Sequence, residues 1–131
     1  MPKRKNIRDE TAEAELSKVF RTDKESIIEL FSSVISKKVR SAKGSAINVR
    51  TGDMFNELIG RSSVTGYVAY RSLLTYYLNY LASKGYAIAN RTRYHNVFTI
   101  PKRINGNIVN PLFNSDPELL KVFLKSILGD A

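Results

Sequence analysis

Residues 47–101 contain an order of local patterns that few folds accommodate, and the rest of the 131-residue chain is arranged around them. The alternation of apolar and polar residues over Ile47–Arg50 predicts one short strand. An apolar stripe over residues 54–59 predicts a short helix, and apolar residues recurring at helical spacing up to Leu81 predict a longer one. Two β-compatible runs follow, on either side of a basic tip. The order is therefore strand, helix, turn, helix and hairpin.

The ends of these elements carry their own signals. Thr22 and Glu25 form a capping box that begins an earlier helix, which Gly44 ends. Thr51 is placed to cap the short helix that follows the first strand. The long helix is predicted to begin near residue 63 or 65, to run to about Ser83, and to close at a glycine, residue 85. Its buried face is predicted to consist of Tyr70, Leu74, Tyr77, Leu78 and Leu81.

The end of this helix resembles that of winged helix-turn-helix DNA-binding proteins, in particular small regulators of archaeal or viral type. The pattern L-x3-L-x2-L-x3-G-Y-x-I, from Leu74 to Ile88, is similar to the end of their recognition helix, and MFNELIG, at residues 54–60, resembles their second helix. The resemblance covers about residues 24–100. The interval from Gly60 to Gly85 is longer than in most such proteins, which implies an extended recognition helix or a larger turn.

The resemblance implies an α+β, mostly helical fold: a winged helix-turn-helix with an N-terminal helical extension and an extra C-terminal helix. It also implies that the N-terminal half of the long helix enters the major groove of double-stranded DNA, where Arg71 can bind guanine O6 and N7 together. Arginines at the hairpin tip suit the minor groove or a phosphate. The predicted DNA-binding residues are Arg50, Thr51, Ser62, Ser63, Thr65, Tyr67, Arg71, Arg91, Arg93 and Tyr94.

The distribution of charge is more informative than the net charge of +9. Residues 36–103 carry twelve lysines and arginines and only two acids, Asp53 and Glu57, whereas residues 9–35 are acidic. A basic surface attracts polyanions, of which nucleic acid is the commonest, although an ordinary solubilising surface has the same charge. Residues 1–8 form a basic tail that is predicted to be disordered. Its candidate phosphate contacts are Lys3, Arg4, Lys5 and Arg8.

Three parts are expected along the chain: the tail at residues 1–8, a winged-helix domain at 9–110, and a C-terminal helix within 111–131. Ser115 or Asp116 caps this helix, with Pro117 at its first position. Apolar residues cover most of its circumference, so it either packs deep in its own domain or pairs with a second subunit. A homodimer is the favoured interpretation. The candidate dimer contacts are Leu120, Phe123, Leu124 and Ile127.

Other function classes lack their signals. The chain has no cysteine and one histidine, so a disulfide, a zinc site or a thiol nucleophile is not expected, and a cytoplasmic location is favoured (the host cytoplasm for a viral protein). Phosphate-binding, dinucleotide-binding and serine-hydrolase motifs are missing from the sequence, so we expect neither an enzyme nor a cofactor. No apolar run reaches the roughly 18 residues of a membrane helix.

The sequence thus predicts a sequence-specific double-stranded DNA-binding protein, a transcriptional regulator acting as a homodimer. Two alternatives remain open. The same basic faces would suit structured RNA, as in a ribosomal-type winged-helix protein. The apolar C-terminal helix would equally suit a protein-interaction or structural module of a virus or of chromatin.

Overall fold

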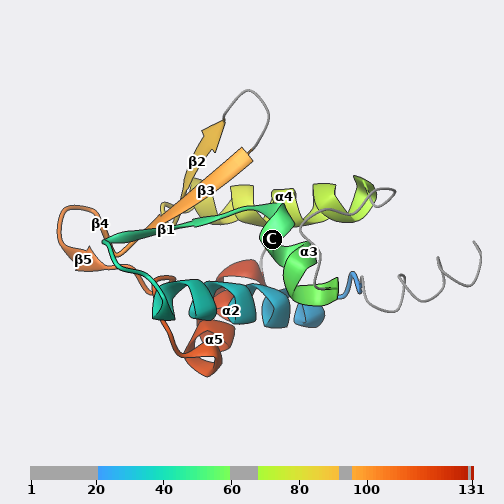
Figure 1. The fold of residues 1–131 in the computed structure, drawn as a ribbon, viewed down its shortest axis with the longest axis horizontal. Helices are drawn as coiled ribbons and strands as arrows, with labels where there is room; N and C mark the ends of the chain where they lie inside the picture. Colours follow the sequence, from blue (N-terminus) through green and yellow to red (C-terminus); the bar gives the residue numbers. More distant parts are fainter. Residues whose placement is uncertain (1–20, 60–67, 92–95, 130) are drawn as a thin grey trace, which may run out of the picture.

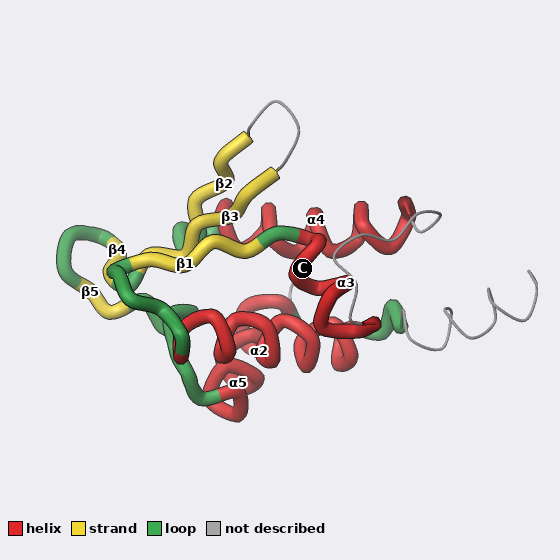
Figure 2. Tube along the Cα trace, in the orientation of Figure 1, coloured by secondary structure: helices red, strands yellow, loops and turns green. Residues whose placement is uncertain are grey.

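The computed structural model describes residues 21–59, 68–91, 96–129 and 131. Over these residues the chain forms an α+β fold of helices and small antiparallel sheets (Figures 1 and 2). The helices are α2 (Lys24–Arg40), α3 (Thr51–Ile59), α4 (Val68–Ser83) and α5 (Pro117–Leu128). The strands are β1 (Ala46–Val49), β2 (Ile88–Arg91), β3 (Asn96–Pro101), β4 (Arg103–Ile104) and β5 (Ile108–Val109).

The larger sheet has the strand order β1-β3-β2, with both pairings antiparallel. Val49 of β1 lies opposite Phe98 of β3, and Ile47 lies opposite Ile100. All four side chains are buried, because alternate residues of a strand point to the same face. The predicted hairpin is confirmed by the antiparallel pairing of β2 with β3, and its first strand begins at Ile88.

The helices enclose the core against this sheet face. The predicted buried face of α4 is confirmed, and its tyrosines meet aromatic rings of the other helices. Tyr77 meets Phe31 of α2 edge-on, with 6.5 Å between ring centres, and Tyr70 lies 6.1 Å from Phe55 of α3. Edge-to-face ring pairs are favourable beyond the area that they bury. Helix α4 is thereby fixed to both α2 and α3.

Gly85 ends α4 as expected. Its φ of +90° is in the left-handed region that favours glycine. The amide of Tyr86 donates to the carbonyl of Leu81 at 3.1 Å, and the amide of Gly85 donates to that of Ala82 at 3.0 Å. These bonds satisfy the last helical carbonyls, as in a Schellman motif, and direct the chain into β2.

The start of α2 differs from the prediction by one residue. The cap is Asp23, whose carboxylate accepts hydrogen bonds from the backbone amide of Ser26 at 3.1 Å and from its hydroxyl at 2.7 Å. Both bonds favour the charged carboxylate and lower the pKa of Asp23. The capping box expected from Thr22 to Glu25 is therefore wrong, because Asp23 provides the better acceptor for the first free amides of the helix.

A second small hairpin turns at Asn105 and Gly106, a residue pair that favours tight turns. Asn105 and Gly106 have φ values of 51° and 89°, and β4 pairs with β5 on either side of them. Asn110 follows β5 and is completely buried. Its side-chain amide donates to the carbonyls of Tyr86 at 2.8 Å and Pro101 at 2.9 Å, and its oxygen accepts from the amide of Leu112 at 3.0 Å. One side chain thus joins the end of α4, the end of β3 and the segment before α5.

Helix α5 has the predicted start, with the carboxylate of Asp116 accepting from the amide of Glu118 at 3.0 Å and Pro117 in the first turn, and it ends at Gly129. Its inward leucines pack in the same hydrophobic core as α2. The assignment of Leu120 and Leu124 to a dimer surface is wrong, because both side chains are 0% exposed within the chain. The other two candidate contacts, Phe123 and Ile127, are half-buried against the same core.

The elements divide the molecule into two sides (Figure 1). Helices α2 and α5 lie together on one side, and the β2–β3 hairpin rises on the other, with α4 beside its base. Helix α3 lies between α2 and α4. A surface formed by α4 and the hairpin is therefore separate from the exposed side of α5.

Candidate nucleic-acid interface

Two cations at the end of α2 neutralise both acids of α3. Lys37 forms an ion pair with Glu57, and Lys38 lies 3.1 Å from Asp53. Ser33 of α2 also donates to Glu57, at 2.7 Å. Since Asp53 and Glu57 are the only acids in residues 36–103, the net positive charge of this region rests on its other lysines and arginines.

The contacts of Glu57 lower the pKa of its carboxyl below the ordinary value of 4.5, chiefly through the hydrogen bond from Lys37 and then through that from Ser33. A carboxyl with a lowered folded pKa stabilises the fold above its unfolded pKa, and this stabilisation is lost as the pH falls through the folded value. We therefore expect Glu57→Gln to cost about 1 kcal/mol near neutral pH and progressively less at acidic pH.

Urea unfolding of wild type and Glu57→Gln between neutral and acidic pH measures this difference. In a Lys37→Met background most of the difference should disappear, because the principal partner of the carboxylate has been removed. A difference that stayed constant as the pH fell, or that persisted in full without Lys37, would contradict the assigned ion pair.

The beginning of α3 differs from the prediction in a way that affects anion binding. Asp53 Oδ2 accepts from the amide of Arg50 at 2.8 Å, and the amide of Asp53 donates to the carbonyl of Arg50 at 3.1 Å. Arg50 therefore holds the cap position, and Thr51, expected to cap the helix, is its first residue. The carboxylate of Asp53 lies at this helix end, where a bound phosphate would otherwise meet free amides. The available cation is instead the exposed side chain of Arg50.

Arg71 is exposed on α4, at the edge that faces α3. Its guanidinium carbon lies 5.7 Å from the centre of the Phe55 ring, an arrangement that restricts a long side chain without using its hydrogen-bond donors. Among the ion pairs of the described residues, none involves Arg50 or Arg71. Both cations are therefore accessible to an external anion. Thr75 is less available, because its hydroxyl donates to the carbonyl of Arg71 at 2.9 Å.

The outward face of α4 also carries a tyrosine that the sequence reasoning did not select. Tyr76 is 54% exposed, whereas Tyr70 and Tyr77 are buried. The ring of Tyr76 stands nearly perpendicular to that of Tyr77, with 5.5 Å between centres. Its position on a helical wheel, opposite Leu74 and Leu81, is the sequence signal that would have identified it as exposed. Ser72, Asn79 and Ser83 are exposed on the same side of α4 as Tyr76, so this side is polar and uncharged. The hydroxyl of Ser83 donates to the carbonyl of Tyr80 at 2.7 Å, which leaves Ser72 and Asn79 as the more available groups.

The β2–β3 hairpin is braced by a chain of side-chain hydrogen bonds. Asn90 of β2 donates to the hydroxyl of Thr99 of β3 at 2.9 Å, and Thr99 donates to Asn48 of β1 at 2.8 Å. A small hollow separates the hairpin from α4, with Asn79 on one wall and Asn90 and Asn96 among the residues of the other. The hairpin is consequently held as part of the sheet up to its last described pair, Arg91 opposite Asn96.

The remaining predicted contacts are placed only in part. Arg91 is described by its backbone as the last residue of β2. The other predicted positions lie outside the described residues: Ser62, Ser63, Thr65, Tyr67, Arg93, Tyr94, Lys3, Arg4, Lys5 and Arg8. Their assignment as DNA contacts stays a prediction.

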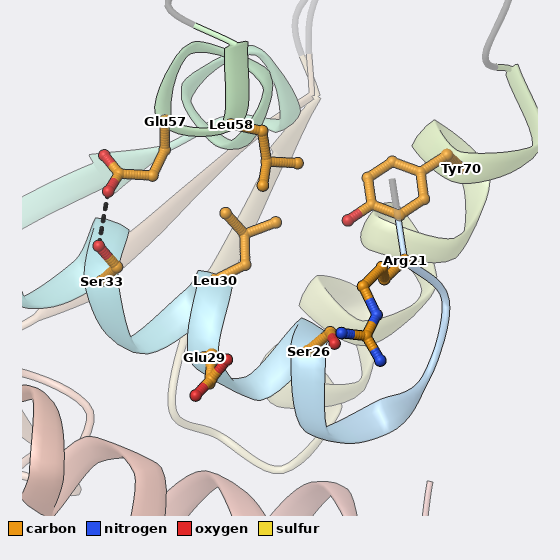
Figure 3. A pocket seen from close by; sticks show the side chains of 8 residues that line it. All are labelled: Arg21, Ser26, Glu29, Leu30, Ser33, Glu57, Leu58 and Tyr70. Carbon is orange, nitrogen blue, oxygen red and sulfur yellow. Dashed lines mark hydrogen bonds between the residues drawn. The ribbon is translucent and has the colours of Figure 1, made fainter. Parts of the chain in front are cut away.

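An open hollow of about 360 Å³ lies between α2, α3 and α4 (Figure 3). Its polar lining is largely engaged: Ser33 bonds Glu57, and Arg21 lies 3.3 Å from Asp23. Burial, with the nearby charge of Asp23, raises the pKa of Tyr70 to about 12, so its phenol keeps its proton at neutral pH. The groups in this hollow contribute to the packing of the three helices rather than to an evident ligand site.

Comparison of the chain with models of protein families, with curated proteins and with solved structures gives no match. In the part of the chain that the structure describes, no helix is both long and apolar enough to cross a membrane. The same residues contain no group of three or more His, Cys, Asp or Glu side chains that would hold a metal ion.

Proposed function

We propose that this chain is a winged-helix protein that binds double-stranded DNA in a sequence-specific manner and regulates transcription. The arrangement α2-β1-α3-α4-β2-β3, with the sheet order β1-β3-β2, supports the fold, because the same order was expected from the resemblance. In this proposal α4 is the recognition helix and the β2–β3 hairpin is the wing.

One observation carries the proposed ligand. Both acids of residues 36–103 are bound by cations of α2, whereas Arg50 and Arg71 are exposed and take part in none of the ion pairs of the described residues. Solubility alone does not require cations that are separated from carboxylates, since a surface of mixed charges is equally soluble. A polyanion favours it, because each cation that is free of an internal carboxylate can neutralise one phosphate.

The choice of duplex DNA over other polyanions rests on shape. A single helix beside a projecting hairpin suits a B-form major groove with the flanking backbone or minor groove, whereas the deep, narrow major groove of duplex RNA excludes a helix. The face of α4 offers hydroxyl and amide groups, which bond base edges as well as phosphates. Binding to RNA in preference to DNA would require a different contact surface.

Fluorescence anisotropy with duplex DNA and duplex RNA of the same sequence, at matched salt, tests the proposal. We expect tighter binding to DNA. The Arg91→Ala/Arg93→Ala variant should bind more weakly and reduce the slope of log K against log salt by about 2, since each lost phosphate contact removes about 0.9. Preference for RNA, or no binding to either duplex at low salt, would overturn the proposed function. An unchanged slope would remove the hairpin from the contact.

A further inference from the structure

The outer side of α5 exposes apolar side chains that its own chain does not cover. Leu120, Leu124 and Leu128 face the core and are 0% exposed, whereas Leu119 is 56% and Val122 69% exposed. Leu119 and Val122 are three residues apart, so they are neighbours on the helix surface. Val122 is the most exposed of the large hydrophobic residues that the structure describes. Placing both in water gives up stabilisation that a partner surface would recover.

Charged and small residues surround this pair. Glu118 precedes it and Lys125 follows it, both exposed, and Ser126 is an exposed small residue next to Lys125. One carboxylate oxygen of Glu118 accepts from Lys121 of the same helix at 3.2 Å, and the side chain of Glu118 stays 78% exposed, so its carboxylate can also meet a cation of a second copy. We call Glu118, Leu119, Val122, Lys125 and Ser126 the outer face of α5. Its negative charge is near the start of the helix and its positive charge near the end, as the helix dipole favours. One short face therefore holds an apolar centre with opposite charges on either side.

We propose that two copies of this chain associate through the outer face of α5, with the helices antiparallel about a two-fold axis near Val122. In that arrangement Glu118 of one copy lies beside Lys125 of the other, and the same pair recurs across the axis. Val122 meets its counterpart at the axis, and Leu119 lies beside Val122 and the small side chain of Ser126 of the other copy. A two-fold interface must be complementary to itself, and this face has that property.

The charge pattern favours a second copy over an unrelated protein. An unrelated partner would need an apolar patch with the opposite order of charges, whereas the outer face supplies that order when it is turned by 180°. The opposed helix dipoles add to the attraction. The proposal does not depend on DNA binding, because α5 lies on the opposite side of the molecule from the β2–β3 hairpin (Figure 1).

The expected dimer is weak. Helix α5 has 12 residues, which makes it about 18 Å long. Two such faces bury less than the roughly 1,200 Å² of a standard stable interface. Association is thus expected in the micromolar range and above, so that monomer and dimer exchange with concentration.

Sedimentation equilibrium of the full chain, without DNA and over a range of concentrations, tests the proposal. Val122→Glu should weaken association by more than about tenfold, because it places two carboxylates together across the axis. Val109→Glu is the matched control: Val109 is 57% exposed but belongs to β5, so association should stay as in wild type. Thermal unfolding of each variant shows whether the fold is intact.

A charge exchange distinguishes this arrangement from non-specific hydrophobic association. Glu118→Lys and Lys125→Glu alone should each weaken association, and the double variant should restore most of it, because the pairs re-form across the axis with reversed signs. A wild-type chain that stays monomeric at every concentration would overturn the proposal. So would equal effects of Val122→Glu and Val109→Glu, or a double variant weaker than both single ones.

Discussion

Asn110→Leu is expected to lower the free energy of unfolding by about 3–5 kcal/mol, since one buried and two partly buried polar groups lose their partner and each such loss costs about 1–3 kcal/mol. The groups are the carbonyls of Tyr86 and Pro101 and the amide of Leu112. Leucine has a similar size and shape, so the change removes hydrogen bonds without opening a large cavity. Domains of this size are stable by only about 5–15 kcal/mol, so much of the population could unfold.

Urea unfolding measures the effect, with Asn107→Leu as the matched control. Asn107 is exposed in the loop between β4 and β5, and its backbone carbonyl accepts a hydrogen bond from Arg103 at 3.1 Å. Within the described residues its side chain has no hydrogen bond. The control should therefore change stability by less than about 0.5 kcal/mol. Similar losses in the two variants would show that the amide of Asn110 is not the junction that its contacts indicate.

Asn110→Asp adds an independent signature. The aspartate keeps an acceptor for Leu112 but loses both donors and directs a charge at two carbonyl oxygens. Its folded pKa should therefore be raised, because burial and the carbonyls oppose the charged form. A raised carboxyl pKa destabilises the fold at high pH, and the deficit shrinks as the pH falls through that value. Improvement relative to wild type on acidification is the expected result, and a constant deficit would contradict it.

Local signals were sufficient for most of the elements in the described residues. Leu74, Leu78 and Leu81 recur at helical spacing, and they are buried because that spacing places them on one face. Gly85 and the Asn105–Gly106 pair adopt positive φ, a conformation that few other residues tolerate. In these places the sequence within a few residues determines the backbone, so no knowledge of distant contacts was needed.

Contacts between distant residues could not be predicted in this way. Helix α5 is apolar around most of its circumference, so its sequence alone did not distinguish Leu120, which is buried, from Leu119, which is exposed. The position of α2 makes that choice. Likewise, Lys37 and Glu57 are 20 residues apart, and their ion pair exists only because α2 and α3 are adjacent. Asn110 was missed for the same reason, since an asparagine after a hairpin reads as an exposed loop residue.

In the candidate interface, too, local sequence signals and contacts between distant residues differ in how well they could be predicted. Arg71 was named from the resemblance as a DNA contact, and the structure places its side chain in solvent. Its contact with the ring of Phe55 required the packing of α3 on α4. The role expected for Thr51 failed because Asp53 competes for the same helix end. A cap assigned from one residue is thus sensitive to a better acceptor two or three positions away.

Arg71→Ala is expected to weaken binding to the preferred duplex by about tenfold to a hundredfold, as for the loss of a bidentate guanine contact worth about 1–3 kcal/mol. The preferred duplex is obtained by selecting bound sequences from a random DNA pool with the wild-type protein. A scrambled duplex of the same length should lose much less affinity, because phosphate contacts dominate there. The expected result is therefore a loss of specificity, measured as the ratio of the two affinities.

Two further variants determine what Arg71 does. Arg71→Lys keeps the positive charge but removes the planar pair of donors, so specificity should fall nearly as far as in Arg71→Ala if the contact is to a base. If the contact is to a phosphate, Arg71→Lys should bind almost as wild type. Lys84→Ala is the control for charge alone, since Lys84 follows the end of α4, about 20 Å along the helix from Arg71.

Equal weakening by Arg71→Ala and Lys84→Ala, on both duplexes, would mean that α4 contributes only its charge. The assignment of α4 as the reading helix would then be lost, although DNA binding itself would stand. Arg71→Ala also removes the contact with the Phe55 ring, which costs about 0.5–1 kcal/mol of stability without involving DNA. Affinities measured well below the unfolding temperature exclude that effect, because a stability change of this size leaves the folded fraction near one.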